Sequence, residues 1–325
     1  MTIEKLSSGS YRIRAMAHGK RYSLTVKKKP SERIARQLIE EKIALDAPAA
    51  AHMSFKIAGQ KYINVKSNVL SPSTVRCYNG ILRNLPKDFL DIDVGYIRTY
   101  EVQKVINDYA ENHSPKSTHN VHGFISAVLK MFCPDVHIHV TLPQKPHIEH
   151  YTPSQDDVKA VLDRAKDTDF YVPLYLATLS CRTSEICALT LEDLHGDELT
   201  INKALVKAED GYVLKPTPKT DASNRIIVLP HDLADRIRQQ GYVYNRSPRK
   251  IYYYLQRSLK RLGIPAFPVH KLRHFFASYA HDMGYSDAQI QKMGGWSTDN
   301  VMKRVYRHAL NEDDARKQIA SDFKF

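Results

Sequence analysis

The segment that organises this chain lies between Val269 and His308, and it contains VHKLRHFFAS (269–278), GGWST (294–298) and VMKRVYRH (301–308). Its chemically distinctive side chains are His270, Arg273, Trp296 and Tyr306. These side chains are poorly suited to a hydrophobic core, because each carries a polar group that needs a hydrogen-bond partner. A guanidinium fork suits two phosphate oxygens, an imidazole transfers protons near neutral pH, and a phenol is a potential nucleophile. The segment therefore predicts a site that surrounds one phosphate ester.

Composition favours a polyanionic partner. The chain has 325 residues and a net charge of +13, with a pI near 9.4. The length suggests two or three domains of roughly 150 residues, and the charge favours either nucleic acid or an anionic membrane surface. The beginning, MTIEKLSSGS, lacks the apolar region of a signal peptide, and no apolar run approaches the ~18 residues of a membrane span. We therefore expect a cytoplasmic, nucleoid-associated protein that binds nucleic acid and no membrane.

Neither the cysteines nor the histidines predict a metal site. The cysteines lack CxxC spacing, so we expect small buried residues in a reducing compartment: Cys77, Cys133, Cys181 and Cys187. A loose histidine group lies among prolines rather than on firm elements: His137, His139, His147 and His150. An interdomain linker is the preferred interpretation of this group, and metal binding is the alternative.

The first fifty residues are strongly basic, with eleven Lys or Arg against five Asp or Glu, a net charge of +6 (11 − 5). Alternating residues in 11–17 and 20–26 predict a β-hairpin. A helix follows Ser31, with Ile34, Leu38 and Ile43 expected on one side. Such a ribbon can enter a major groove, and a solvated basic extension is the alternative. Residues 47–51 are expected to form a linker.

Residues 52–147 are expected to be helical. Helices are predicted from Phe55, from Ser71-Pro72, after Thr99 and from Ser114-Pro115, because capping residues precede apolar positions at helical spacing. The polar first turn of the fourth helix, residues 116–120, suits phosphate contact, and simple capping explains it equally well.

Residues 151–325 carry a second set of polar residues beside predicted core. A buried helix over 170–179 leads to Arg182 and Glu185, which form either a local ion pair or part of the phosphate site. Strands are predicted over 199–206, 212–214 and 226–229, and these place Lys219 near a hairpin tip, where a surface lysine is the alternative. Rival nucleophiles at Tyr252–Tyr254 are expected on a helix face instead.

These motifs resemble the tyrosine recombinases, specifically the phage and conjugative-transposon integrases. CRTSEICALTLEDL (181–194), PKTDASNR (218–225), HKLRH (270–274) and GGW (294–296) match in order and at similar spacing. The matched positions are Arg182, Lys219, His270, Arg273, Trp296 and Tyr306, with Glu185 as the acidic neighbour of the first arginine. Ser180 stands where the family more usually has glycine, and Trp296 stands where the family more commonly has histidine.

The resemblance implies a multidomain, mainly α fold with small β-sheets. Its parts would be a sheet-plus-helix arm-type DNA-binding domain (1–50), a helical core-site DNA-binding domain (51–147) and a catalytic domain (148–325).

The resemblance also implies a site-specific integrase that integrates and excises a mobile element. Tyr306 would attack the phosphodiester and form a 3′-phosphotyrosine, so no ATP is required. Arg182 and Arg273 would stabilise phosphoryl charge, Lys219 would protonate the leaving oxygen, His270 would assist proton movement, and Trp296 would support the phosphate's surroundings. No cofactor or metal is expected.

The implied partners are double-stranded DNA attachment sites and a homotetramer formed on them. The resemblance leaves open whether an excision factor and a host DNA-bending protein take part. After Tyr306, a short helix from Glu312 with Ile319, Phe323 and Phe325 is expected to dock on a neighbouring protomer, with docking on its own domain as the alternative.

Two other functions compete with this interpretation. A Xer-like resolvase is disfavoured by the basic N-terminal segment, which such resolvases lack. A DNA-binding regulator without cleavage activity is disfavoured because all six matched positions carry suitable side chains.

Overall fold

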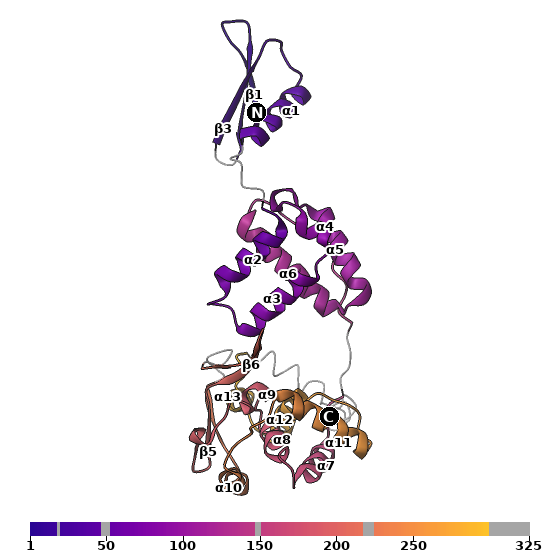
Figure 1. Cartoon of the computed structure of the whole chain (residues 1–325), viewed down its shortest axis with the longest axis vertical. Coiled ribbons are helices and arrows are strands. Elements are labelled where there is room, and N and C mark those ends of the chain that lie inside the picture. The colour runs from indigo at the N-terminus through magenta and orange to yellow at the C-terminus, as the bar shows by residue number, and fades with distance from the viewer. Residues whose placement is uncertain (18–19, 47–52, 147–150, 217–223, 299–325) are drawn as a thin grey trace, which may run out of the picture. The chain divides into compact units, whose positions relative to one another are not determined.

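The computed structural model describes residues 1–17, 20–46, 53–146, 151–216 and 224–298. The fold is mainly helical with small antiparallel sheets (Figure 1), as the sequence predicted. It divides into two compact units: residues 1–66 with 79–144, and residues 67–78 with 145–325. The division into three domains stays a prediction. Within the described residues, no helix has the length and apolar character that a membrane crossing requires.

The N-terminal part of the first unit is a three-stranded sheet covered by one helix. Strands β1 (Thr2–Lys5), β2 (Tyr11–Ala17) and β3 (Lys20–Val26) pair antiparallel in that order. Helix α1 (Glu32–Asp46) packs against them. The predicted hairpin and helix are confirmed, whereas β1 was missed because four residues give too short an alternation.

The predicted apolar face of α1 was partly wrong. The helix buries Ala35 and Ile39 against Ile13 and Tyr22 of the sheet. Ile34 is 51% exposed, because it lies one position, about 100° of helical rotation, away from Ala35. The predicted linker at 47–51 and the side chain of Ile43 lie outside the described residues.

The rest of the first unit is a helical bundle. It contains α2 (Phe55–Lys66), the end of α3 (Pro72–Asn84), the short α4 (Lys87–Asp91), a 3₁₀ turn η1 (Val94–Tyr96), α5 (Thr99–Asn112) and α6 (Pro115–Phe132). Helix α6 packs against α2 and α5. Ser114 caps α6 by accepting a hydrogen bond from Ser117 N, as predicted. The expected apolar face of α6 is buried: Val121, Phe124, Ile125, Val128 and Leu129.

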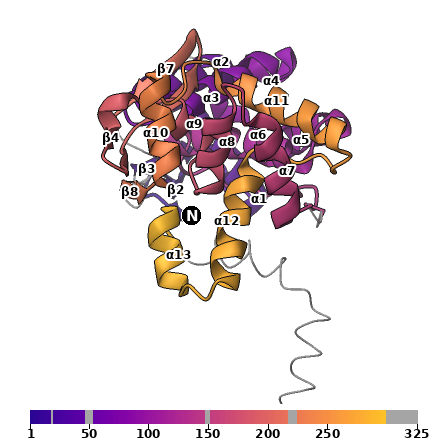
Figure 2. The ribbon, with the colours of Figure 1, turned by 90° about the horizontal axis from the view of Figure 1, so that it is seen from below.

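The second unit surrounds one buried helix, α8 (Tyr171–Thr178). The elements over residues 155–240 have eleven residues or fewer. In order these are α7 (Gln155–Ala165), α8 (Tyr171–Thr178), α9 (Thr183–Ile186), η2 (Leu191–Asp193), β4 (Leu194–His195), β5 (Glu198–Ile201), β6 (Ala204–Ala208), β7 (Gly211–Lys215), β8 (Arg225–Val228) and α10 (His231–Gln240). Longer helices follow: α11 (Pro248–Leu262), α12 (His270–Asp282) and then the eight-residue α13 (Asp287–Gly294). Figure 2 shows α12 and α13 side by side.

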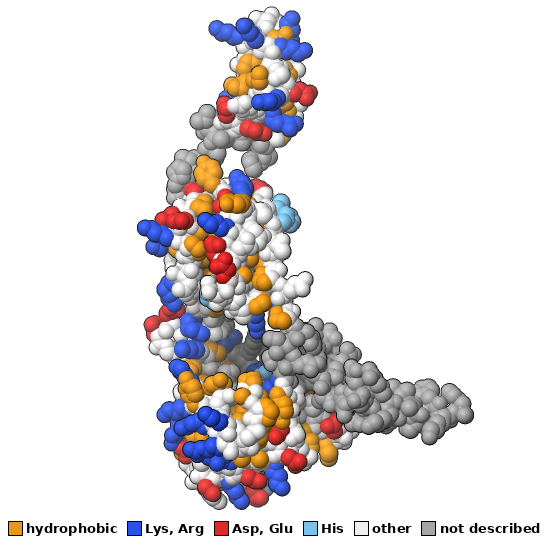
Figure 3. Space-filling model, turned by 90° about the vertical axis from the view of Figure 1, so that its right-hand side faces the viewer, with side chains coloured by type: hydrophobic (Ala, Val, Ile, Leu, Met, Phe, Trp, Pro, Cys, Tyr) orange, Lys and Arg blue, Asp and Glu red, His pale blue; other side chains and the backbone are white. Residues whose placement is uncertain are grey.

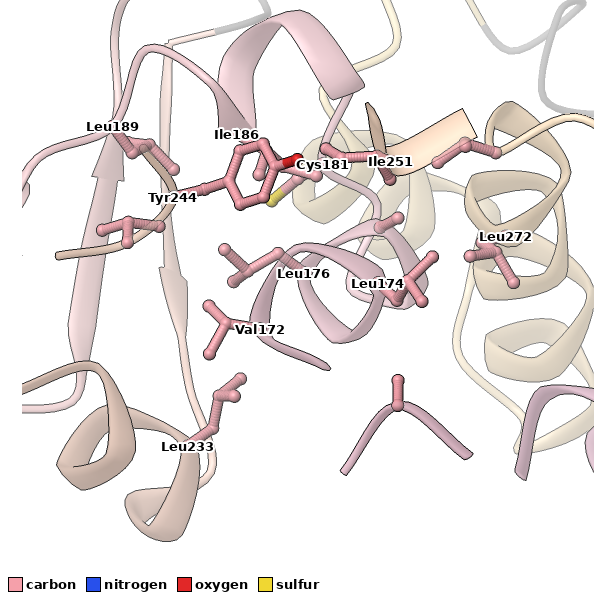
Figure 4. Packing of buried hydrophobic residues seen from close by; sticks show 14 of the residues in the cluster. Val172, Leu174, Leu176, Cys181, Ile186, Leu189, Leu233, Tyr244, Ile251 and Leu272 are labelled. Atoms are coloured by element: carbon pink, nitrogen blue, oxygen red, sulfur yellow. The ribbon is translucent and has the colours of Figure 1, made fainter. Parts of the chain in front are cut away.

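Helix α8 lies at the centre of this unit's core. Six of its eight residues are buried, and the other two, Tyr171 and Tyr175, are half-buried. Its residues Val172, Leu174 and Leu176 point in different directions in Figure 4, toward partners that include Leu233 of α10 and Leu272 of α12. This burial fixes the chain that leaves α8 toward Arg182.

Two predictions in the second unit were wrong. The single strand expected over 199–206 is two strands in different sheets, because β5 pairs with β8 while β6 pairs with β7. Lys203 lies between β5 and β6 and forms an ion pair with Asp193 at 2.7 Å. The cysteines are free, but only Cys181 is buried, and Cys77, which lies on α3, is exposed.

Candidate active site

Residues from four separate segments meet at one end of the buried helix. The turn after α8 supplies Ser180 and Arg182, and β8 supplies Arg225. Helix α12 supplies Arg273, and the turn after α13 supplies Gly295. The convergence brings together Arg182 and Arg273, which the sequence analysis had assigned to one site.

A buried carboxylate, Glu185, links two of the arginines. It accepts hydrogen bonds from Arg182 N at 2.9 Å, Arg182 Nη1 at 2.5 Å and Arg225 Nη2 at 3.0 Å. Burial by itself raises the pKa of Glu185, but Arg225 and then Arg182 outweigh this effect and hold the pKa below its ordinary value. The carboxylate is therefore ionised at neutral pH. The predicted local ion pair exists, but it is part of a larger cluster.

Two backbone carbonyls serve the same arginines. Ser180 O accepts from Arg225 Nη2 at 3.1 Å and from Arg273 Nη1. Gly295 O accepts from Arg182 Nη2 at 3.1 Å and from Arg273 Nη2 at 3.4 Å. Both carbonyls belong to residues with positive φ, 72° for Ser180 and 64° for Gly295. Both acceptor carbonyls therefore come from residues whose backbone is in the left-handed region.

The cluster carries an excess of positive charge. Three guanidiniums face one carboxylate, which leaves +2 (3 − 1). Burial, followed by repulsion from Arg182 and Arg225, lowers the pKa of Arg273 to about 9, so this group stays protonated at pH 7. Arg273 is only 1% exposed, whereas the side chain of Arg182 is 28% exposed. An arriving anion would reach Arg182 from solvent and relieve the repulsion.

His270 begins α12 and faces the same charges. Desolvation of the ring, followed by repulsion from Arg273 and Arg182, lowers its pKa to about 4. The residue is nevertheless exposed to solvent. A neutral imidazole at pH 7 is able to accept a proton. The positive end of the helix also favours an anion at this position.

Trp296 is both a core residue and a support for the arginines. It is 6% exposed and packs with Ala277, Ala280 and Ile290. The guanidinium carbon of Arg273 lies 4.2 Å from the centre of its ring, within cation–π range. The expectation that Trp296 does not belong to a hydrophobic core was therefore wrong, because the indole body packs while its face meets the cation.

Lys219 and Tyr306 lie outside the described residues, as does the chain after residue 298 in which tail docking was predicted. The structure instead adds Arg225, which the sequence analysis did not assign. A weak signal was present: Arg225 stands two positions before the buried Ile227, so strand alternation places both on the inward face of β8. Tyr252 and Tyr253 are exposed on α11, and Tyr254 is partly buried there, as predicted.

Comparisons with known proteins show similarity to integrases and to a tyrosine recombinase. Residues 154–313 match the phage integrase family. A prophage phiRv2 integrase of Mycobacterium tuberculosis is 27% identical over 186 residues, covering 51% of this chain and 48% of that protein. The tyrosine recombinase XerA of Thermococcus kodakarensis is 25% identical over 192 residues, covering 51% of this chain and 62% of that protein. The chain thus spans about half the length of the first of these relatives.

Solved structures confirm the predicted fold. The Tn1549 transposon integrase in complex with transposon right end DNA has a TM-score of 0.67 at 17% identity, covering 83% of this chain and 99% of that one. A lambda integrase dimer bound to a COC′ core site has a TM-score of 0.59 at 16% identity and covers 95% of both chains. The architecture is therefore that of the tyrosine recombinase integrases.

Proposed function

We propose that this chain, whose residues 154–313 match the phage integrase family, is a site-specific recombinase that integrates and excises a mobile element. The observation that carries the proposal is the cluster of Arg182, Arg273 and His270 within the matched residues, which holds excess positive charge beside a neutral imidazole. Such a site suits a phosphodiester, whose charge increases in the transition state.

In the proposed reaction, the hydroxyl of Tyr306 attacks a DNA phosphate and displaces the 5′-oxygen. A 3′-phosphotyrosine forms, and the hydroxyl of a partner strand reverses the step. Arg182 and Arg273 stabilise the phosphoryl oxygens, while Lys219 donates a proton to the leaving oxygen. His270 moves the proton at the tyrosine side, and Trp296 supports Arg273.

Double-stranded DNA attachment sites are the proposed substrate. Figure 3 shows Lys and Arg side chains gathered on one face of the second unit, and α11 carries five exposed basic residues without an acidic one. Structures of lambda integrase include a tetramer bound to a Holliday junction, which supports a homotetramer on DNA. The same proposal includes an excision factor, a host DNA-bending protein and a cytoplasmic, nucleoid-associated location.

We propose that residues 1–50 bind arm-type DNA sites, residues 51–147 bind the core site, and residues 148–325 carry out catalysis. The sheet with α1 has its own small core, and this supports a separate role for the first segment.

A nicked suicide substrate tests the proposed activity. The wild-type protein should form a protease-sensitive covalent adduct with DNA, because loss of the short nicked fragment prevents religation. Tyr306→Phe should bind the DNA without forming the adduct, since it loses only one hydroxyl. Absence of an adduct with wild type on its own attachment site, or an adduct with the Phe variant, would contradict the proposal.

A further inference from the structure

The three arginines of the centre form a closed ring with three acceptors. Arg225 and Arg273 share Ser180 O, Arg273 and Arg182 share Gly295 O, and Arg182 and Arg225 share the carboxylate of Glu185. Each guanidinium is thus linked to both of the others through one acceptor. In such a ring, a change at one donor alters the geometry at two acceptors.

Arg225 is suited to position this ring rather than to contact a ligand. Its side chain is 4% exposed, against 28% for Arg182. Burying a third cation among like charges is costly, and an apolar residue beside Ile227 on the inward face of β8 would avoid that cost. Arg225 therefore needs an explanation beyond packing, and its hydrogen bonds to Glu185 and Ser180 O provide one.

We propose that Arg225 is a positioning residue of the recombinase centre that keeps Arg182 available to the scissile phosphate. Arg225 Nη2 donates to Glu185 Oε2, which also accepts from the backbone N–H of Arg182, so the guanidinium of Arg182 is engaged through Oε1. Without Arg225, both oxygens of Glu185 turn to the guanidinium of Arg182 in a two-pronged pair. This pair draws Arg182 away from Gly295 O and from the phosphate. The inference rests on the proposed function, because it concerns the same site.

Single-turnover cleavage of the suicide substrate tests this role. Arg225→Met should slow cleavage by about 10²-fold, the effect of misplacing a catalytic group by roughly 1 Å, with DNA affinity unchanged. Arg225→Lys keeps the positive charge but has one nitrogen donor group in place of the guanidinium fork, so it should give an intermediate rate. Arg238→Ala is the matched control, because Arg238 forms exposed ion pairs with Asp235 and Asp197 on α10 and β4–β5. It should cleave like the wild type.

A double-mutant cycle identifies the partner through which Arg225 acts. In a Glu185→Gln background, the further change Arg225→Met should cause a much smaller loss than in the wild type, because no carboxylate remains to capture Arg182. Arg225→Met alone should also shift the acid limb of the cleavage profile to higher pH, because Arg225 lowers the pKa of Glu185. Melting curves establish which variants are folded. If Arg225→Met is not folded, Arg225→Lys replaces it in these measurements.

Inorganic phosphate provides a readout that does not depend on cleavage. It should raise the melting temperature of the wild type and of Arg238→Ala more than chloride at equal ionic strength, and the extra shift should be lost in Arg225→Met. If the wild type forms no adduct but this pattern holds, the proposed function fails while the positioning role stands. Three results would overturn the positioning role. The losses in cleavage rate of the two single variants could multiply to give that of the double variant, Arg225→Met could lose DNA affinity in parallel with cleavage, or Arg225→Met could behave like the wild type.

Discussion

Ser180 is the only described residue other than glycine with a positive φ, 72°. This conformation costs an L-residue about 1–2 kcal/mol, yet it accompanies the carbonyl that two arginines share. The hydroxyl contributes only a weak hydrogen bond to Met293 O at 3.4 Å. The strain therefore belongs to the backbone geometry of the site rather than to a role of the side chain.

Ser180→Gly should accordingly stabilise the protein by about 1 kcal/mol, because relief of strain exceeds the entropy that glycine adds to the unfolded chain. Cleavage should remain close to wild type, since the carbonyl stays in place. Urea denaturation of both proteins measures the change. A loss of stability would show that the weak hydroxyl contact matters more than the backbone conformation.

His270 should make stability depend on pH. Its pKa falls from 6.5 to about 4 on folding, so between these values the unfolded chain binds more protons than the folded one. Stability should therefore decrease as the pH falls from about 6.5 to 4. His270→Gln should weaken this dependence, as measured by denaturation at several pH values. A folded-state NMR titration of His270 near 6.5 would contradict the assignment.

The turn after α13 depends on a close approach between Gly294 and Trp296. A Cβ added at Gly294 would lie 1.6 Å from Cζ3 of the indole, so the ring would have to move. Because that ring lies under Arg273, the glycine helps to define the arginine's position.

Gly294→Ala should destabilise the protein by about 1–3 kcal/mol through overpacking, and it should slow cleavage because Trp296 leaves Arg273. Gly123→Ala on α6 is the matched control, since open space surrounds its Cβ position and alanine favours a helix. Denaturation and single-turnover cleavage measure both effects. Equal behaviour of the two variants would mean that the indole has another position of similar energy.

Helices were more predictable from the sequence than strands and strand partners. Caps such as Ser114 and the apolar spacing of α6 are local signals, and they located that helix and its buried face. By contrast, the break between β5 and β6 depends on pairing with β8 and β7, which lie farther along the chain. The ring through Arg225 could not be predicted for the same reason, because its acceptors come from distant segments.

Charge is distributed unevenly along the chain, and this bears on how it would hold DNA. Residues 1–50 carry +6 of the net +13. Within this segment, Ile13, Tyr22, Ala35 and Ile39 form a core of their own. Removing the segment should therefore leave the other described cores intact.

Deletion of residues 1–50 should preserve cleavage at a core site but impair complete integration. The affinity for arm sites should also depend less steeply on salt concentration. Each lost phosphate contact reduces the magnitude of the slope of log K against log salt by about 0.9. Replacing Lys27, Lys28 and Lys29 by Gln in the full chain is the matched control: it removes three charges but keeps the sheet. That variant should lose part of the slope and retain arm-site selectivity, whereas the deletion should lose both. If the deletion leaves affinity and salt dependence unchanged at every part of the attachment site, the basic sheet and α1 do not bind DNA.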